Sequence, residues 1–213
     1  MTHPARSLPK ISSSQTNSRM QLVGIFGGTF DPVHFGHLAI ARSFLGSGLI
    51  EELWVMLTPD PPHKQDRDPV AYSIREAMLQ AAFKDEDRVT VCTLEESLPA
   101  PHYTLRTLQY LYRKHPDQTF YLCIGGDSLA HFDEWYHWQE ILKLSELIIA
   151  RRPGAKVGAI PGPILKRAHF IDHEPLAVSS TDIRNRCAKG LPIDDLVPKE
   201  VARLIATHSL YRN

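Results

Sequence analysis

The sequence predicts an α/β fold in which a doubly wound, mostly parallel β-sheet is covered by helices on both faces. Short apolar runs that end in Gly, Pro or Asp alternate along the chain with segments whose apolar residues recur at helical spacing. Such alternation is typical of right-handed strand–helix–strand units. The chain has 213 residues, 43% of them hydrophobic, and no low-complexity linker divides it. We therefore expect a single domain over residues 21–213.

The first elements follow from this alternation. An apolar run at 22–26 predicts the first strand, and apolar residues at helical spacing over 38–45 predict a helix after it. A second strand is predicted at 53–57. The Pro-rich segment 58–64 and the charged tract that follows it predict a long loop.

The central elements continue the same pattern. Strands are predicted at 89–91 and 119–124, and the helix between them is expected over 105–112, with Thr104 as its cap. The preceding helix is expected to end near Phe83, and its predicted apolar stripe is Ile74, Ala77, Met78, Ala81 and Ala82.

The carboxyl-terminal part predicts two more strands, at 147–150 and 168–171. The polar and aromatic segment 128–142 is expected to be rich in helix, and residues 155–166 read as a loop because they hold several Gly and Pro. Two last helices are predicted at 180–187 and 198–207, and the first opens with Ser-Ser-Thr-Asp, a run of residues that favour helix caps.

Composition excludes several classes of protein. Lys plus Arg (24) equal Asp plus Glu (24), so a global basic surface for nucleic acid is not expected. The three cysteines form no CxxC pair, which argues against a zinc site or a disulfide framework and favours the reducing cytoplasm. No apolar run approaches the roughly 20 residues that span a membrane. Residues 1–20 are rich in Ser, Thr, Asn and Pro and are expected to be a disordered tail.

The segment 27–37, Gly-Gly-Thr-Phe-Asp-Pro-Val-His-Phe-Gly-His, is the strongest candidate for a functional site. It lies between the first strand and the first helix, so His34 and His37 fall near a helix N-terminus, where free N–H groups favour anions. Neither a GxGxxG nor a GxxxxGK[ST] phosphate motif is present. Polar turns follow four strands, and we expect them to converge at the carboxyl edge of the sheet.

The residues alone leave simpler explanations open. The two histidines fit a metal pair, although no third His or Cys lies close in sequence, or they are satisfied within the core. The Ser-Ser-Thr run with Arg184 after it is commonly only a capped helix. Trp135, Tyr136 and Trp138 are commonly core residues.

Two motifs resemble the signatures of the HxGH nucleotidyltransferase superfamily. His34-Phe35-Gly36-His37 matches HxGH, and Val178 to Arg184 (VSSTDIR) resembles ISSTxIR, differing only at its first position. The resemblance implies a Rossmann-like fold and transfer of AMP or CMP from a nucleoside triphosphate without a covalent enzyme intermediate. Ser180 and Thr181 would open a helix that holds a phosphate, while the planar guanidinium of Arg184 would bind triphosphate oxygens.

Four further stretches resemble the bacterial nicotinate-nucleotide adenylyltransferases, and the likeness runs from about residue 21 to the end. They are Pro-Pro-His-Lys at 61–64, His-Tyr-Thr at 102–104 where that family usually has Ser-Tyr-Thr, Ile-Gly-Gly-Asp-Ser at 124–128 with Trp-Tyr following, and Arg-Arg-Pro-Gly at 151–154. The resemblance implies transfer of AMP from ATP to nicotinate mononucleotide, giving nicotinate adenine dinucleotide and pyrophosphate in NAD biosynthesis.

The resemblance also implies roles for individual residues. His34, His37 and Arg184 would be catalytic. Trp135 would stack on the pyridine ring while backbone N–H groups of Thr104 and Tyr136 bind its carboxylate; the acceptor residues are Tyr103, Thr104, Trp135, Tyr136 and Lys64. The ATP-binding residues are Gly27, Gly28, Thr29, Phe30, His37, Gly125, Asp127, Arg152, Ser180, Thr181 and Arg184.

The implied reaction is in-line attack by the acceptor phosphate, which needs no general base. Mg²⁺ is expected to arrive with ATP, because the sequence holds no carboxylate cluster dedicated to a metal. A homodimer is compatible with the sequence. Three alternatives remain: a pantetheine-phosphate adenylyltransferase, a transferase that prefers the amide acceptor, and a nucleotide-sensing regulator without turnover.

Overall fold

The computed structural model describes residues 20–59, 69–151 and 160–212. Its centre is a six-stranded sheet in the order β3-β2-β1-β4-β5-β6, and every strand pairs in parallel with its neighbours. The chain starts mid-sheet, adds strands on one side and then crosses to the other, which confirms the predicted doubly wound sheet. The strands are β1 (Gln21–Gly28), β2 (Glu52–Leu57), β3 (Val89–Cys92), β4 (Gln118–Gly125), β5 (Glu146–Arg151) and β6 (Ala168–Asp172).

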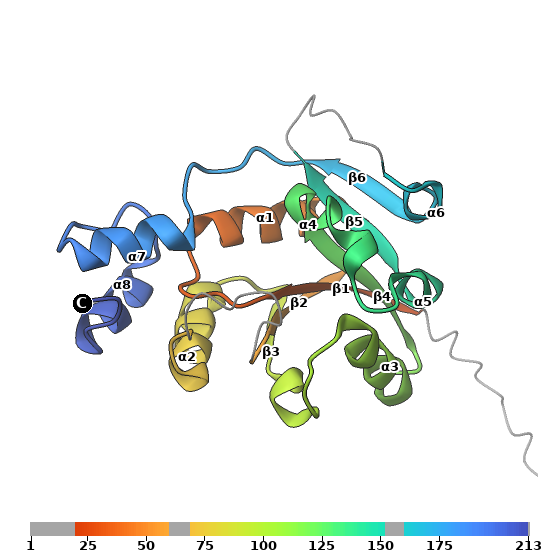
Figure 1. Ribbon diagram of the computed structural model, residues 1–213, viewed down its shortest axis with the longest axis horizontal. Coiled ribbons are helices and arrows are strands. Elements are labelled where there is room, and N and C mark those ends of the chain that lie inside the picture. The colour runs from red at the N-terminus through yellow and green to blue at the C-terminus, as the bar shows by residue number, and fades with distance from the viewer. Residues whose placement is uncertain (1–19, 60–68, 152–159, 213) are drawn as a thin grey trace, which may run out of the picture.

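Helices cover both faces of the sheet (Figure 1), and each face has its own apolar core. The helices of the first face are α1 (Phe35–Gly46), α2 (Tyr72–Phe83), α7 (Ser180–Ala188) and α8 (Lys199–Thr207). Those of the second are α3 (Thr104–Lys114), α4 (Gly126–Leu129), α5 (Trp138–Leu144) and α6 (Gly162–Leu165). Within the described ranges, no helix is long and apolar enough to cross a membrane.

The central position of β1 in the sheet explains why its sequence is apolar throughout and does not alternate with polar residues. Val23 and Ile25 belong to the core on the α3 side, while Phe26 belongs to the core on the α1 side. A central strand of a covered parallel sheet buries both of its faces, so both sets of side chains are apolar. The same position places the residues that follow β1 at the centre of the carboxyl edge.

The segment 128–142 is rich in helix, as predicted, but its helical residues do not form one continuous helix. It consists of the end of α4, a 3-10 turn at Phe132–Glu134 and α5. His137, just before α5, has a φ of 51°, a left-handed conformation that interrupts a right-handed helix. Trp135 and Tyr136 therefore project from a bend rather than from a helix face.

Other predictions need smaller corrections. Tyr103 is the N-cap residue of α3 and Thr104 its first helical residue, with no side-chain cap. The predicted loop 155–166 contains α6, and its first five residues lie outside the described ranges. The stripe predicted for α2 is displaced by about one position, because Ala77 is exposed and the buried residues are Arg75, Met78, Leu79, Ala82 and Phe83.

The predicted tail lies outside the described residues except for Met20, as does most of the predicted loop after β2.

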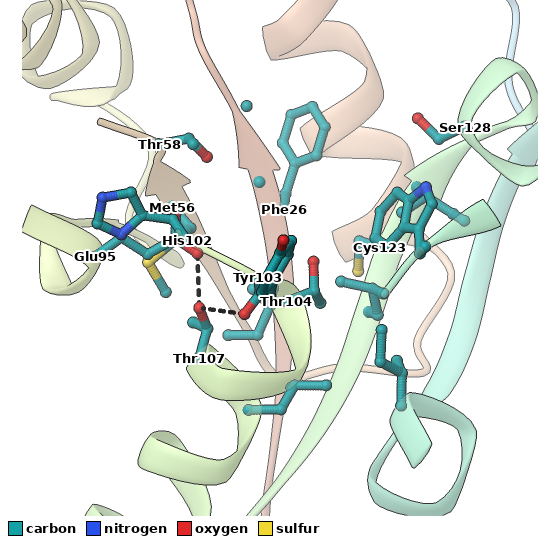
Figure 2. A pocket seen from close by; sticks show the side chains of 18 of the residues that line it. Phe26, Met56, Thr58, Glu95, His102, Tyr103, Thr104, Thr107, Cys123 and Ser128 are labelled. Atoms are coloured by element: carbon teal, nitrogen blue, oxygen red, sulfur yellow. Dashed lines mark hydrogen bonds between the residues drawn. The ribbon is translucent and has the colours of Figure 1, made fainter. Parts of the chain in front are cut away.

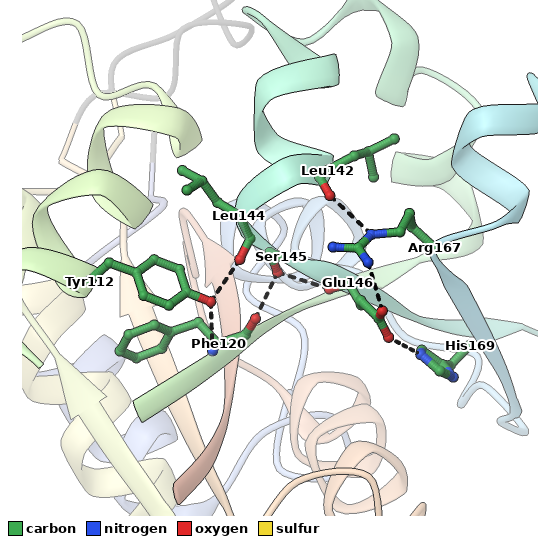
Figure 3. A network of polar contacts seen from close by, with 8 residues as sticks. All are labelled: Tyr112, Phe120, Leu142, Leu144, Ser145, Glu146, Arg167 and His169. Carbon is green, nitrogen blue, oxygen red and sulfur yellow. Dashed lines mark hydrogen bonds and ion pairs between the residues drawn. The ribbon is translucent and has the colours of Figure 1, made fainter. Parts of the chain in front are cut away.

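A polar network ties β4 and β5 together near their amino ends (Figure 3). The Tyr112 hydroxyl donates to the Leu144 carbonyl at 2.7 Å and accepts from the Phe120 N–H at 3.2 Å. The Ser145 hydroxyl donates to the Phe120 carbonyl at 3.0 Å. Glu146 binds Arg167 at 3.0 Å and His169 at 2.6 Å. These contacts fix the strands from the edge opposite the one that carries the candidate site.

Candidate active site

A cavity of about 530 Å³ opens at the carboxyl ends of β1 and β4, where the strand order reverses direction. Gly27 and Gly28 from β1 and Gly125 from β4 form part of its lining. A Cβ atom on Gly27 would meet nothing within 4 Å, whereas one on Gly28 would lie 2.8 Å from the Phe30 ring. Gly27 therefore leaves open space beside β1, at the switch point where α/β sheets bind ligands, while Gly28 makes room for the Phe30 ring.

The turn after β1 is built around a strained and buried residue. Phe30 has a φ of 46° and is 3% exposed, and its ring packs edge-on against Phe26 and His37 at centroid distances of 5.6 and 5.0 Å. Residues other than glycine rarely adopt this conformation, so the surrounding packing must hold it. Phe30 thereby supports the turn from the core.

His34 and His37 lie stacked at the start of α1, with ring centroids 3.7 Å apart. The His34 N–H donates to His37 Nδ1 at 3.2 Å, so a neutral His37 ring carries its proton on Nε2. A Cβ on Gly36 would lie 2.9 Å from His34 Nδ1, which explains why glycine stands between the two histidines. The spacing of the motif thus lets the His34 backbone N–H hold the His37 imidazole in one orientation.

His34 is the more deeply buried of the two histidines. Burial lowers the pKa of its imidazole to about 4, so the ring is uncharged at neutral pH. Its Nδ1 is buried and has no hydrogen-bond partner among the described residues. His34 is therefore suited to hydrogen bonding as a neutral ring and not to supplying positive charge.

The second motif docks on this turn. The Ser180 hydroxyl donates to the Pro32 carbonyl at 2.9 Å, and Arg184 Nη1 donates to the Asp31 carbonyl at 2.9 Å. Arg184 Nη2 also donates to the Thr181 hydroxyl at 3.0 Å. The Asp31 carboxylate in turn accepts from the Tyr211 hydroxyl at 2.6 Å. Two segments that are far apart in sequence are thus joined beside the start of α1.

The amino end of α7 has a side-chain cap. Ser179, and not Ser180, is the N-cap residue, and its hydroxyl accepts from the Asp182 N–H at 3.1 Å. Arg184 is half-buried and Thr181 is exposed. The capped end therefore presents a hydroxyl and a guanidinium next to the histidine turn.

Four of the predicted acceptor residues line the same cavity as Gly27 and Gly28. Tyr103 and Tyr136 stack face to face, with ring centroids 4.2 Å apart and planes inclined by 14°. Trp135 packs against the buried Phe132 at 5.2 Å. Trp138 does not line the cavity and packs against the core, as predicted.

Several predicted site residues lie apart from the cavity wall. The histidines, Ser180, Thr181 and Arg184 form a neighbouring cluster around the turn, and Phe30 is buried beneath it. Asp127 is exposed on α4 and does not line the cavity. Lys64 and Arg152 lie outside the described residues. Within the described ranges, no three His, Cys, Asp or Glu side chains are grouped to hold a metal ion.

Arg75 is a site residue that the sequence prediction missed. It is 1% exposed, and its guanidinium donates to the carbonyls of Thr29, Thr58 and Pro59, each at 2.9 Å. It therefore joins α2 to the turns after β1 and β2. A charged residue three positions before Met78 on the buried stripe is the sequence signal that identifies it.

Glu95 was also missed, and it lies on the cavity wall with His102 (Figure 2). Its Oε1 accepts from the Thr107 hydroxyl at 2.7 Å. Burial raises the pKa of the Glu95 carboxyl, although the hydrogen bond from Thr107 and the nearby Thr58 and His102 side chains oppose the shift. No local pattern marks Glu95, because its burial depends on the packing of α3.

Comparison with known proteins agrees with this geometry. The family model described as cytidylyltransferase-like matches residues 25–186. The nicotinate-nucleotide adenylyltransferase of Bacillus subtilis (strain 168) is 35% identical over 194 residues, which cover 91% of this chain and 100% of the relative. The probable nicotinate-nucleotide adenylyltransferase of Shouchella clausii is 36% identical over 192 residues, covering 90% of this chain and 97% of the relative.

Solved structures share the fold. Plasmodium falciparum nicotinic acid mononucleotide adenylyltransferase complexed with NaAD has a TM-score of 0.73 at 21% identity, over 90% of this chain and 97% of that one. The same enzyme complexed with APC has a TM-score of 0.71. The family match and the two bacterial relatives show the family as well as the fold. The chain therefore belongs to the cytidylyltransferase-like family and, within it, to the nicotinate-nucleotide adenylyltransferases.

Proposed function

We propose that the protein transfers the AMP moiety of ATP to nicotinate mononucleotide. An oxygen of the acceptor's 5′-phosphate bonds to the α-phosphorus of ATP, the bond to the bridging oxygen breaks, and pyrophosphate leaves with its electron pair. The product is nicotinate adenine dinucleotide. The observation that carries this proposal is the docking of Ser180 and Arg184 on the His34–His37 turn, beside a cavity lined by Tyr103, Thr104, Trp135 and Tyr136.

The turn and the second motif would stabilise the phosphates. The attacking phosphate is already anionic, so the protein's task is to position it and to neutralise spreading charge. His37 would donate from Nε2, because its Nδ1 accepts from the backbone. His34 would donate as a neutral ring, Thr29 would hydrogen-bond one phosphate, and Arg184 would bind the departing pyrophosphate.

The remaining predicted roles complete the two substrate sites. Gly27 and Gly125 leave room for ATP at the switch point, and Asp127 would accept from the ribose hydroxyls of adenosine. Trp135 would stack on the pyridine ring, while N–H groups of Thr104 and Tyr136 bind the carboxylate. Thr104 is the first residue of α3, where helix N–H groups lack internal partners. Arg152 and Lys64 keep their proposed roles in ATP and acceptor binding.

ATP is proposed to bring Mg²⁺ with it. The ion would offset part of the triphosphate charge. Because the turn would supply neutral hydrogen-bond donors, the ion would be held mainly by phosphate oxygens. The Asp31 carboxylate, the nearest on the turn, accepts from the Tyr211 hydroxyl. A cytoplasmic location and a homodimer also remain proposals.

Three acceptors distinguish this function from its rivals. Purified full-length chain with ATP and Mg²⁺ should release pyrophosphate much faster with nicotinate mononucleotide than with nicotinamide mononucleotide or phosphopantetheine. A preference for phosphopantetheine would overturn the assignment. Binding of ATP without turnover on any acceptor would favour the regulator instead.

A further inference from the structure

Two buried polar atoms of the cavity wall have no hydrogen-bond partner among the described residues. Glu95 is 6% exposed, and its Oε2 is unpaired while its Oε1 accepts from Thr107. The Nδ1 atom of His102 is likewise buried and unpaired. Leaving a buried polar group unpaired is unfavourable, so such a pair in one cavity indicates a site for a ligand or water.

The position of these atoms indicates which part of the acceptor they meet. His102 lies two residues before Thr104, whose N–H is proposed to bind the group on the pyridine ring. Glu95 is held by Thr107, one turn further along α3. Figure 2 shows the Glu95 and His102 side chains next to each other on the wall of the cavity that Thr104 also lines. Both atoms would therefore be near the ring's exocyclic group if Thr104 binds it as proposed.

We propose that Glu95 and His102 contact the exocyclic group of the pyridine acceptor at two points. His102 binds an oxygen that the acid and the amide share, and Glu95 contacts the position at which they differ. This inference rests on the proposed function and extends it to the choice between the two acceptors.

The protonation state of Glu95 decides whether it favours the acid or the amide, because it decides whether Glu95 can donate a hydrogen bond. An ionised Glu95 only accepts hydrogen bonds, so it matches the NH₂ group of the amide and repels a carboxylate. A protonated Glu95 donates through its O–H, so it matches the acid. His102 serves both acceptors, because each offers an oxygen.

The groups around Glu95 set when it loses its proton. Thr107 from α3 donates to its Oε1, the nearby Thr58 and His102 side chains also favour its ionised form, and the Cys92 thiol of β3 lies within electrostatic reach. Burial outweighs these effects and raises the pKa of the carboxyl. The proton therefore persists to higher pH than on an exposed glutamate and is lost as pH rises through the raised pKa.

The measurement is the ratio of kcat/KM for nicotinate mononucleotide to that for nicotinamide mononucleotide, followed from pH 5 to pH 9. Titration of ATP and of the acceptor phosphate affects both acceptors and cancels in the ratio. In the wild type, the ratio should fall about tenfold or more as pH rises. In Glu95→Gln, which has no titrating group and retains a donor, the ratio should not change with pH.

Glu96→Gln is the matched control, because Glu96 is the exposed neighbour on the same turn, and it should retain the wild-type curve. His102→Ala, which removes the ring nitrogens without supplying another donor, should raise KM for both acceptors by a similar factor and preserve the pH dependence of the ratio. An effect on only one acceptor would overturn the role of His102.

Two outcomes separate the inference from the proposed function. Turnover with superimposable ratio curves for the wild type and Glu95→Gln would overturn the inference alone. Absence of turnover with either mononucleotide would overturn the proposed function and this inference with it. Circular dichroism of each variant checks that the fold is intact.

Discussion

Arg184 donates a hydrogen bond at 2.9 Å to the carbonyl of Asp31, a residue 153 positions earlier in the chain. Together with the bond from Ser180 to Pro32, this contact fixes the distal motif against the turn that bears both histidines. The proposed triphosphate site is therefore one unit formed by two distant segments, and changes in either segment should affect the same kinetic step.

His37→Ala should lower kcat by about 10²- to 10³-fold, because it removes one preorganised donor to the phosphates. Steady-state pyrophosphate release measures this effect. His208→Ala is the control, since that residue is exposed at the end of α8. Near-normal turnover of a folded His37→Ala protein would exclude His37 from phosphate stabilisation.

Trp135→Ala should raise KM for the acceptor about tenfold and leave KM for ATP almost unchanged, because stacking on the ring is lost. Trp138→Ala provides the comparison: it removes a half-buried tryptophan that packs against the core outside the cavity, and it should lower stability instead. If Trp135→Ala behaved like Trp138→Ala, the stacking role would be wrong.

Arg75→Met should reduce the free energy of unfolding by about 3 kcal/mol and raise KM for ATP. It leaves three carbonyls of the turns after β1 and β2 without their donor. Urea unfolding and initial rates measure the two effects. Arg88→Met, a change at an exposed arginine, should alter neither. An Arg75→Met protein with wild-type stability would contradict this role.

The burial of His34 predicts a stability that depends on pH. Its pKa is about 4 in the folded protein and about 6.5 in the unfolded chain, so between these values the unfolded chain binds more protons. The stabilisation is complete above pH 6.5 and is lost as pH falls towards 4, a change of roughly 3 kcal/mol. Chemical unfolding at pH 7.5 and 4.5 should show a smaller loss for His34→Asn than for the wild type. An equal loss in both proteins would argue against this burial effect.

The strands could be predicted because each is an apolar run with clear ends, and burial on both faces of a parallel sheet preserves that signal. The helix-rich character of residues 128–142 was predicted, but not where its helices break. Trp135 packs on Phe132, and His137 adopts a left-handed conformation just before α5. Neither feature has a local signature.

The candidate site, too, was predicted from the sequence only in part. The His34–His37 turn was evident from its position between a strand and a helix, and Arg184 was linked to it through motif resemblance. Arg75 and Glu95 were not found, because each is a charged residue that only packing removes from water. A charge buried by distant elements cannot be recognised from periodicity alone.

The contacts of Asp31 also have a consequence for synthesis on the ribosome. The histidine turn emerges early, yet Ser180 and Tyr211 reach it across 148 and 180 positions of sequence. A nascent chain that has folded the first strand and helix has not yet made either bond. The turn therefore acquires these bracing contacts only after Ser180 and Tyr211 have been synthesised, so the proposed triphosphate site is completed long after its first segment has been made.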